Sequence, residues 1–321
     1  VFPKGINYDR FRNKALAIHN ETSPPSVIQQ EMKEFKESGN LEKLIISIGK
    51  LDYTKGIPIR LKAFELFLQS YPEYQGRVSL IVQAIPSGET SEHFDRLKSQ
   101  VDELVGRING NYSTITWTPV RYLNQVFDMD ERCELYSLSD IALILPIRDG
   151  MNLVSKEYLA TKDDGKGVLV LSEMAGSAKE LVGALHVNPN NLDDIADGIQ
   201  RALTMPEQEQ IERNRKMQGT LKRNNVNRWA KHFLERLEEA HKASQDLYVK
   251  HFNKKVADEL ISKYKKAKNR LIFLDYDGTL VNFRSNPNSA APTSKLYEIL
   301  AKLTADKKNT VVLISGRDKD I

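Results

Sequence analysis

The chain has 321 residues, of which 40% are hydrophobic and 28% charged, and its formal net charge is +4; this composition excludes a mostly disordered chain and predicts about two domains. No apolar run approaches the roughly 20 residues needed to cross a bilayer, and the small charge excess does not indicate nucleic-acid binding. The single cysteine, Cys133, excludes a disulfide framework, and because the first residues lack a signal-peptide pattern we expect a cytoplasmic protein.

From Lys43 to Val187, short apolar runs alternate with longer segments whose apolar residues recur at helical spacing. The runs that predict strands are 44–48, 78–82, 115–117, 141–145, 168–171 and 185–187, and the segments between them that predict helices are 57–70, 92–108, 130–137, 151–160 and 178–182. Strands that are apolar throughout need helices on both faces, and such sheets are parallel. The predicted fold class is therefore α/β, a Rossmann-like doubly wound parallel sheet, which binds ligands beyond the carboxyl ends of its strands.

Helices are also predicted at 192–205 and 226–243, and a very polar stretch follows. The segment Lys254–Arg270 carries seven Lys or Arg residues beside a single apolar stripe. We interpret it as an exposed linker helix with a solvated basic face, and a nucleic-acid or membrane patch is the alternative. Because a new apolar run begins at 271–274, we predict a first domain at 1–243, a linker at 244–270 and a second domain at 271–321.

The segment Gly49–Gly56 follows the first strand, precedes a helix, and contains Lys50 and Lys55. Glycines let the backbone approach a ligand, a helix N-terminus offers free N–H groups, and the lysines supply positive charge. These features suit a phosphate group, and an exposed basic turn explains the spacing at least as well. The segment is neither a Walker A motif nor a dinucleotide fingerprint, since GxxxxGK[ST] and GxGxxG are absent.

A second polar segment, Arg148–Glu157, follows the strand at 141–145. The backbone N–H groups from Gly150 to Leu153 would point at an anion. Asp149 and Glu157 lie eight residues apart, so on a helix both carboxylates would face roughly the same way and could take hydroxyl groups. A helix cap at Asp149 with surface charge around it explains the pattern equally well.

Together with their surroundings, these two segments resemble glycosyltransferase family 20, the trehalose-6-phosphate synthases, which are retaining enzymes with a GT-B fold. Further matches in the same order are Phe2–Asn7, Gly106–Gly110, Trp117–Pro119, Tyr122–Gln125, Gly167–Gly176 and Val187–Pro189. The resemblance covers the chain up to the predicted linker. It implies that this region is the C-terminal, donor-binding half of a GT-B fold.

The family transfers glucose from UDP-glucose to glucose 6-phosphate, giving trehalose 6-phosphate and UDP, and it uses no metal or other cofactor. The resemblance implies that Lys50 and Lys55 contact the UDP diphosphate and that Glu157 holds the ribose hydroxyls. It assigns the donor sugar to Asp149, with the backbone of Gly150, Met151, Asn152, Leu153 and Val154 at the glucose and the diphosphate. Lys55 and the helix N-terminus would stabilise the negative charge that develops on the leaving UDP.

Two positions depart from the family, which usually has arginine where Lys50 stands and where our alignment places Gly88. Lysine keeps the charge but loses the bidentate fork, and the second arginine helps to bind the acceptor phosphate. These departures favour, as the alternative, a non-catalytic synthase-like scaffold or regulatory domain. The family's first domain, which supplies most acceptor contacts, is missing from this sequence, which starts at Val1 without Met. We therefore expect a piece of a longer chain that does not complete transfer alone.

The apolar run at 271–274 continues into Asp275–Thr279, and a strand that ends in DxDGT resembles the first motif of haloacid-dehalogenase-like phosphatases. The resemblance implies Asp275 as the nucleophile that forms an aspartyl phosphate and Asp277 as the general acid and base. It places both carboxylates at a Mg²⁺ ion, which prefers hard oxygen ligands. The segment Val311–Arg317 resembles the second motif, in which Ser315 holds the phosphoryl group. The second domain would thus be the incomplete beginning of a phosphatase.

The order of the two regions resembles that of bifunctional trehalose-6-phosphate synthase/phosphatases. The expected partners are therefore UDP-glucose, glucose 6-phosphate and trehalose 6-phosphate, with neither nucleic acid nor a membrane. Whether copies of the chain form a homo-oligomer stays open. Another nucleotide-sugar glycosyltransferase fused to a phosphatase is a further alternative.

Overall fold

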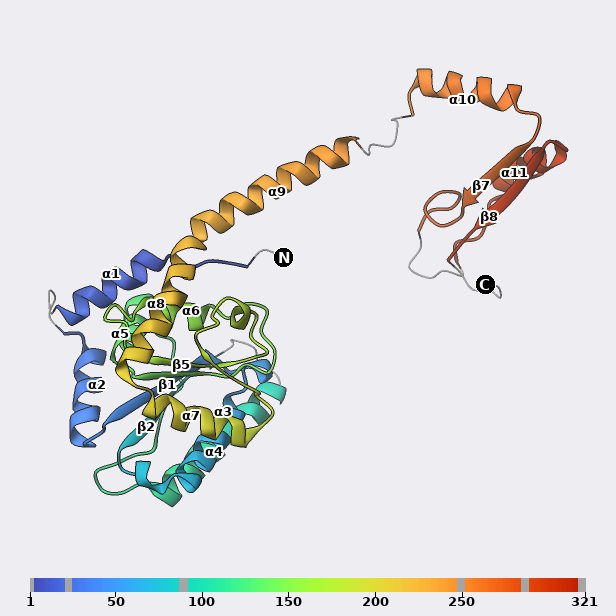
Figure 1. Ribbon diagram of the computed structural model, residues 1–321. Coiled ribbons are helices and arrows are strands. Elements are labelled where there is room, and N and C mark those ends of the chain that lie inside the picture. Colours follow the sequence, from blue (N-terminus) through green and yellow to red (C-terminus); the bar gives the residue numbers. More distant parts are fainter. Residues whose placement is uncertain (1–2, 21–24, 87–91, 247–251, 284–288, 317–321) are drawn as a thin grey trace. The chain divides into compact units, whose positions relative to one another are not determined.

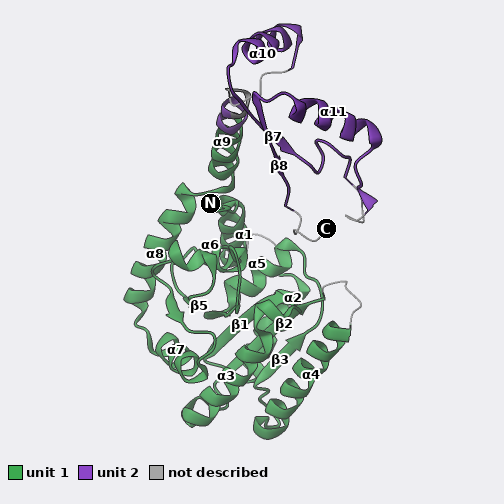
Figure 2. Cartoon of the chain, turned by 90° about the vertical axis from the view of Figure 1, so that its right-hand side faces the viewer, with its two compact units in different colours: residues 1–238 green, residues 239–321 purple. Residues whose placement is uncertain are grey.

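The computed structural model describes residues 3–20, 25–86, 92–246, 252–283 and 289–316. The chain divides into two compact units, Val1–Glu238 and Glu239–Ile321, which Figure 2 draws in different colours. The division falls inside helix α9 (Val226–Asp246), so the segment 244–270 belongs to the second unit. Each unit has its own sheet and is described by itself.

Within the described residues, a parallel sheet of six strands forms the centre of the first unit. The strands are β1 (Lys43–Lys50), β2 (Val78–Ile85), β3 (Val120–Leu123), β4 (Ile141–Ile144), β5 (Val168–Ser172) and β6 (Leu185–Val187). Their order across the sheet is β3-β2-β1-β4-β5-β6. The chain starts in the middle, builds one edge, and returns to place β4 beside β1, which confirms the predicted doubly wound sheet. The direction of winding reverses between β1 and β4, and such a switch point is where open α/β sheets bind ligands.

Helices cover both faces of this sheet, as its uniformly apolar strands require. One layer contains α3 (Ile57–Ser70), α4 (Glu92–Tyr112) and α7 (Leu192–Thr204), drawn below the sheet in Figure 1. The other layer contains α1 (Tyr8–His19), α2 (Val27–Ser38), α5 (Met129–Leu138), α6 (Leu153–Ala160) and α8 (Glu207–Arg223). The loop after β1 leads to α3 in one layer, and the loop after β4 leads to α6 in the other.

Helix α3 has the bounds that its periodicity predicts. Leu61, Phe64 and Leu68, the predicted apolar stripe, are completely buried. Each such side chain stabilises the fold by about 1.5–3 kcal/mol relative to an exposed one. The packing of this stripe anchors α3 against its neighbours and so fixes the loop 51–56, which joins the end of β1 to the helix.

The strand predicted at 115–117 is wrong, because the described residues between the end of α4 and Val120 form no strand. The indole N–H of Trp117 donates to Ser79 Oγ at 3.0 Å, and its backbone exchanges hydrogen bonds with Thr114. Ile115 is exposed, so the apolar residues there do not mark a buried strand. The edge strand begins only at Val120.

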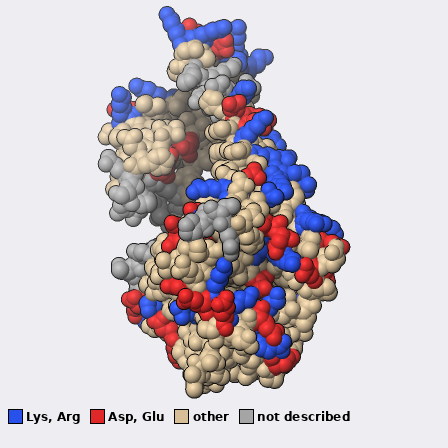
Figure 3. All heavy atoms as spheres, turned by 90° about the vertical axis from the view of Figure 1, so that its left-hand side faces the viewer, with Lys and Arg blue, Asp and Glu red and all other residues tan. Residues whose placement is uncertain are grey.

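Acidic and basic side chains are interspersed over the face of the first unit that Figure 3 shows. Exposed ion pairs occur in this unit, such as that of Arg77 with Glu42. No helix in the described part of the chain is both long enough and apolar enough to cross a membrane.

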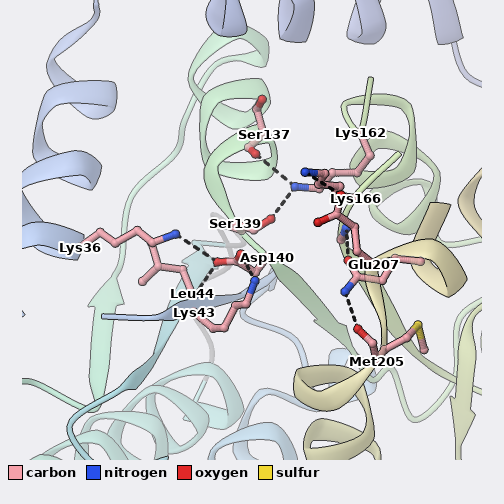
Figure 4. Close-up of polar contacts among 12 residues, drawn as sticks. Lys36, Lys43, Leu44, Ser137, Ser139, Asp140, Lys162, Lys166, Met205 and Glu207 are labelled. Atoms are coloured by element: carbon pink, nitrogen blue, oxygen red, sulfur yellow. Dashed lines mark hydrogen bonds and ion pairs between the residues drawn. The ribbon is translucent and has the colours of Figure 1, made fainter. Parts of the chain in front are cut away.

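A buried lysine, Lys162, holds the end of α5, as Figure 4 shows. Its Nζ donates to the carbonyl oxygens of Tyr136 at 2.6 Å, Ser137 at 3.2 Å and Ser139, and it lies 4.6 Å from the centre of the Tyr158 ring. A cation near the last carbonyls of a helix is favourable. Burial nevertheless lowers the pKa of Lys162 to about 8, since desolvation disfavours the charged form.

We expect Lys162 to make the stability of the first unit rise between about pH 8 and pH 10. The folded-state pKa is about 8, whereas an unfolded lysine has a pKa of about 10.4. In this interval the unfolded chain binds the proton more often than the folded chain, and stability then increases with pH. The measurement is the urea midpoint across this range for the wild type and for Lys162→Met. Equal pH slopes in the two proteins would contradict the expectation.

The second unit contains α10 (Lys254–Lys266), β7 (Arg270–Asp275), α11 (Ser294–Ala305) and β8 (Asn309–Ile314). The two strands pair in parallel, with Asp275 opposite Ile314. The expected basic helix is α10, and none of its residues is buried. Leu271 and Phe273 on β7 are 60% and 59% exposed. One face of this two-stranded sheet is therefore open within the described residues.

Candidate functional site

Two loops meet at the switch point of the first sheet. The loop 51–56 leaves β1, and the loop 145–152 leaves the neighbouring strand β4. The backbone N–H of Ile147 donates to Thr54 O at 2.8 Å, and Lys55 Nζ contacts Asp149 Oδ2 at the same distance. The fold thus brings together two predicted site residues that are 94 positions apart in the sequence.

The first loop is shaped by its own side chains. Asp52 Oδ1 accepts the backbone N–H of Thr54 at 2.7 Å and caps the short 3₁₀ helix Tyr53–Lys55. Gly56 ends this turn with a φ of +67°, and a Cβ added there would overlap the carbonyl oxygen of Leu145. Glycine alone tolerates both conditions. The loop consequently lies directly against the end of β4, which limits where its lysine can reach.

Asp149 is partly buried, and both of its carboxylate oxygens have donors. Oδ2 accepts from Lys55 Nζ and from Asn152 Nδ2 at 3.2 Å, and Oδ1 accepts from the backbone N–H of Met151 at 3.4 Å. Burial alone would raise the pKa of Asp149, but the Lys55 ammonium and the other donors hold it below its ordinary value. Asp149 is therefore ionised at neutral pH, in a fixed orientation that suits it to accept hydrogen bonds from hydroxyl groups.

Helix α6 begins at Leu153, two residues later than the sequence predicts. Asn152, with a φ of +59°, is its N-cap, and its Oδ1 accepts the backbone N–H of Ser155 at 3.0 Å. Asp149 is thus neither the cap nor part of the helix, and the expectation that it shares a helix face with Glu157 is wrong. The sequence does carry a signal for the cap, because asparagine directly before a helical apolar stretch is a preferred N-cap.

The first turn of α6 presents backbone donors. Among the described residues, the N–H groups of Leu153 and Val154 have no acceptor, as is usual at the start of a helix. The carbonyl of Gly150 lies so close to Gly176 that a Cβ at position 176 would overlap it. The predicted backbone segment Gly150–Val154 therefore runs in a constrained path into a helix N-terminus, where anions are favoured.

Glu157, on α6, has one carboxylate oxygen held by neighbouring groups. The Tyr136 hydroxyl donates to Oε2 at 3.0 Å, and Arg132 Nε lies 3.9 Å from the same oxygen. Burial raises the pKa of Glu157, and the Arg132 charge and the Tyr136 hydrogen bond oppose this rise only in part. Oε1 has no hydrogen-bond partner among the described residues, so it is the oxygen that a ligand could use.

Lys50, the last residue of β1, is exposed and lines a cleft of about 750 Å³. The lining residues of this cleft are Lys50, Leu51, Asp52, Tyr53, Thr54, His93, Phe94, Arg96, Leu97 and Gln100. Lys55 and Asp149 are not among these lining residues. Gly88, the second position that departs from the family, lies outside the described residues.

The sequence reasoning misses Lys156, which ties three segments together at this site. Its side chain is 1% exposed, and its Nζ contacts both carboxylate oxygens of Glu180 at 3.0 Å. The same ammonium donates to the carbonyl oxygen of Lys4 at 3.0 Å and lies 3.8 Å from Met151 Sδ. No local pattern signals this role, since a lysine in a polar stretch usually faces water.

The polar cluster of the second unit follows β7. Asp275 is the last residue of that strand, and Thr279 Oγ1 donates to its Oδ2 at 2.9 Å. The backbone N–H of Tyr276 donates to Ile314 O at 3.1 Å, so the chain after β7 runs beside the end of β8, where Ser315 follows. The parallel register thus brings the two predicted phosphatase motifs to the same edge of the sheet.

The turn after β7 carries the second carboxylate. Gly278 has a φ of +81°, and its N–H donates to Val281 O at 2.7 Å, which closes the turn that contains Asp277. Within the described residues, no group of three or more His, Cys, Asp or Glu side chains could hold a metal. A pair of carboxylates still fits Mg²⁺, which usually keeps several waters and binds one or two carboxylates together with a phosphate.

Comparison with known proteins assigns a family to each part of the chain. Residues 1–239 match glycosyltransferase family 20, and residues 273–321 match the trehalose-phosphatase family. A bifunctional trehalose-6-phosphate synthase/phosphatase from Thermoproteus tenax is 41% identical over 322 residues, which cover 100% of this chain and 43% of the relative.

Solved structures match the first unit. A structure from E. coli bound with UDP-2-fluoro glucose is 37% identical, with a TM-score of 0.68. The alpha,alpha-trehalose-phosphate synthase (UDP-forming) from Burkholderia xenovorans, in complex with glucose-6-phosphate, is 35% identical, with a TM-score of 0.69. Each match covers 74% of this chain and 51% of the solved chain, so this chain spans about half the length of these relatives or less. Because the family match covers residues 1–239, this chain belongs to glycosyltransferase family 20.

Proposed function

We propose that this chain is the donor-binding part of a trehalose-6-phosphate synthase within a bifunctional synthase/phosphatase. The synthase would transfer glucose from UDP-glucose to glucose 6-phosphate with retention. The observation that carries the proposal is the 2.8 Å contact between Lys55 and Asp149 at the switch point of the sheet. The relatives reported above support it, and because they are about twice as long, the activity is proposed for the whole protein. The cytoplasm, a reducing compartment that suits the single cysteine, is part of the proposal.

In this proposal the donor is held by charge and by oriented hydrogen bonds. The Lys55 ammonium has three donors, of which Asp149 takes one, so the others can reach the diphosphate. The N–H groups at the start of α6 bind the same anion, and Asp149 accepts from a sugar hydroxyl. Glu157 Oε1 accepts from the ribose. As the bond to glucose breaks, negative charge grows on UDP, and these fixed donors stabilise it without a metal.

The phosphatase half of the proposal rests on the edge of the second sheet, where Asp275 ends β7 and Ser315 directly follows the neighbouring strand β8. Asp275 would attack the phosphorus of trehalose 6-phosphate to form an aspartyl phosphate as the P–O bond to trehalose breaks, and Asp277 would protonate the departing trehalose oxygen. Asp277 would then take a proton from the water that hydrolyses the aspartyl phosphate and releases inorganic phosphate. Mg²⁺ would supply charge neutralisation, with the two carboxylates among its ligands. Because Thr279 already donates to Asp275 Oδ2, the other oxygen, Oδ1, is the one assigned to the attack.

The alternative function, a non-catalytic synthase-like scaffold or regulatory domain, is favoured by one observation. Lys50, which stands where the family usually has arginine, lines a cleft that does not include Lys55 or Asp149. A scaffold of this kind would not need the Lys55–Asp149 pair, which is intact here. A measurement of donor binding therefore tests the synthase proposal against this alternative.

The experiment is calorimetric titration of the folded chain with UDP and with UDP-glucose. We expect Lys55→Ala to weaken both ligands about 10- to 100-fold, the cost of a lost charge-assisted hydrogen bond. Asp149→Ala should weaken the binding of UDP-glucose more than that of UDP, because it removes an acceptor for the sugar.

Asp275→Asn, in the second unit, is the control that leaves both affinities unchanged. In the whole protein the same variant should abolish phosphate release from trehalose 6-phosphate. If the folded wild type binds neither nucleotide, either the site needs the rest of the protein or the scaffold is the function, and the same titration of the whole protein distinguishes the two.

A further inference from the structure

Arg60, near the start of α3, is a buried cation directly beneath the proposed diphosphate loop. Its side chain is 1% exposed. Nη1 donates to Ser47 Oγ at 2.8 Å and to Ile48 O at 3.2 Å, and Nη2 donates to Lys55 O at 2.5 Å. A Cβ added at Gly49 would lie 3.6 Å from both Nη atoms, so the guanidinium lies close under the backbone of the same segment.

These hydrogen bonds leave the charge of Arg60 without a counter-ion in contact. Among the described residues no carboxylate forms an ion pair with it, and its Nε is buried without a partner. Asp149 acts on it through space, but that carboxylate is already in contact with Lys55. Burial lowers the pKa of Arg60 to about 10, so the side chain remains a cation at neutral pH.

Two buried lysines of the described residues have positive charges that are better compensated than the charge of Arg60. Lys156 contacts both carboxylate oxygens of Glu180. Lys162 has three carbonyl acceptors and the Tyr158 ring around its ammonium. A buried charge that is neither paired nor fully hydrogen-bonded destabilises a protein. A bound anion at the loop above would compensate the charge of Arg60, and only in the liganded state.

We propose that Arg60 is a positioning residue for the donor diphosphate, which holds the Lys55 carbonyl in place and adds its buried positive charge to the field at the loop. The inference rests on the proposed function and adds to it a residue that touches no ligand itself. Salt screens such a charge poorly because it is buried. The effect of Arg60 on affinity should therefore be larger for a charged ligand than for a neutral one. An arginine with a purely structural role would affect both ligands alike.

The test titrates the wild type, Arg60→Met and Arg60→Lys with UDP by calorimetry and with uridine by NMR, after circular dichroism has shown each protein to be folded. We expect Arg60→Met to weaken UDP at least tenfold and to change the affinity for uridine less than threefold. Arg60→Lys, which keeps the charge but loses the fork, should bind UDP within about fivefold of the wild type. If Arg60→Met does not fold, Arg60→Gln serves as the uncharged variant.

Each other outcome overturns the inference in a distinguishable way. If UDP binds the wild type and the uncharged variant within threefold of one another, Arg60 has no role at the donor site, and the proposed function stands. If UDP and uridine weaken equally, Arg60 is only structural. If the lysine variant loses as much UDP affinity as the uncharged one, the charge is not what matters. If the folded wild type binds neither ligand, the proposed donor site fails together with the inference.

Discussion

Replacing Lys156 with methionine should lower the free energy of unfolding of the first unit by about 3–5 kcal/mol, the usual cost of breaking a buried ion pair by removing one partner. The Lys156 side chain is 1% exposed and that of Glu180 is 14% exposed. Without the ammonium, the Glu180 carboxylate stays largely buried with no counter-ion, and the carbonyl of Lys4 loses its donor. Urea unfolding followed by the fluorescence of the buried Trp117 measures the loss.

A matched surface pair provides the control for this prediction. Lys166 contacts Glu207 at 2.9 Å, but the two side chains are 50% and 62% exposed. Exposed pairs contribute about 0–1 kcal/mol, so Lys166→Met should change the stability little. The double variant of Lys156→Met with Glu180→Met should regain much of the lost stability, because an apolar pair is often as stable as a buried ion pair. Equal losses in the Lys156 and Lys166 variants would refute the prediction.

Local pattern predicts most of the first sheet because its strands and helices are defined by their own apolar residues. The stripe of α3 is an example, since Phe64 and its neighbours are both periodic in sequence and buried in the fold. Helix α8 is missed because Asn214 and Gln218 face the core beside Met217, and polar residues interrupt the apolar stripe. Both amides donate to backbone carbonyls, which satisfies them inside the core. Periodicity alone cannot distinguish such an inner face from a surface.

The site is harder to predict, because its contacts join segments that are far apart in the chain. The loop of Lys55 and the loop of Asp149 meet only because β1 and β4 are neighbours, and strand order is not a local property. Family resemblance identifies both residues but not their contact with one another. Arg60 illustrates the limit, since nothing near it in the sequence distinguishes a buried guanidinium from the exposed arginine that is usual on a helix. The sequence therefore predicts the individual strands and helices well, but it does not predict which of them lie side by side.

Gly56→Ala should be the most damaging of the small substitutions in the donor loop, both for stability and for UDP binding. At a φ of +67°, any other residue except asparagine or aspartate costs about 1–2 kcal/mol. At this position the new Cβ would also overlap the carbonyl oxygen of Leu145, which is backbone and cannot rotate away. The loop must then move off the end of β4, and the total loss should reach about 3 kcal/mol, in the range of strained backbone sites.

Gly76→Ala separates the two causes of this loss. Gly76 has a φ of +78°, but a Cβ added there would meet no atom within 4 Å. It should therefore show only the conformational cost of about 1–2 kcal/mol, with an unchanged affinity for UDP. Gly56→Ala should in addition weaken UDP at least tenfold, because moving the loop separates Lys55 from Asp149, which now lie 2.8 Å apart. If the two variants lost the same stability and both kept UDP affinity, the close approach of the two loops would not be what organises the donor site.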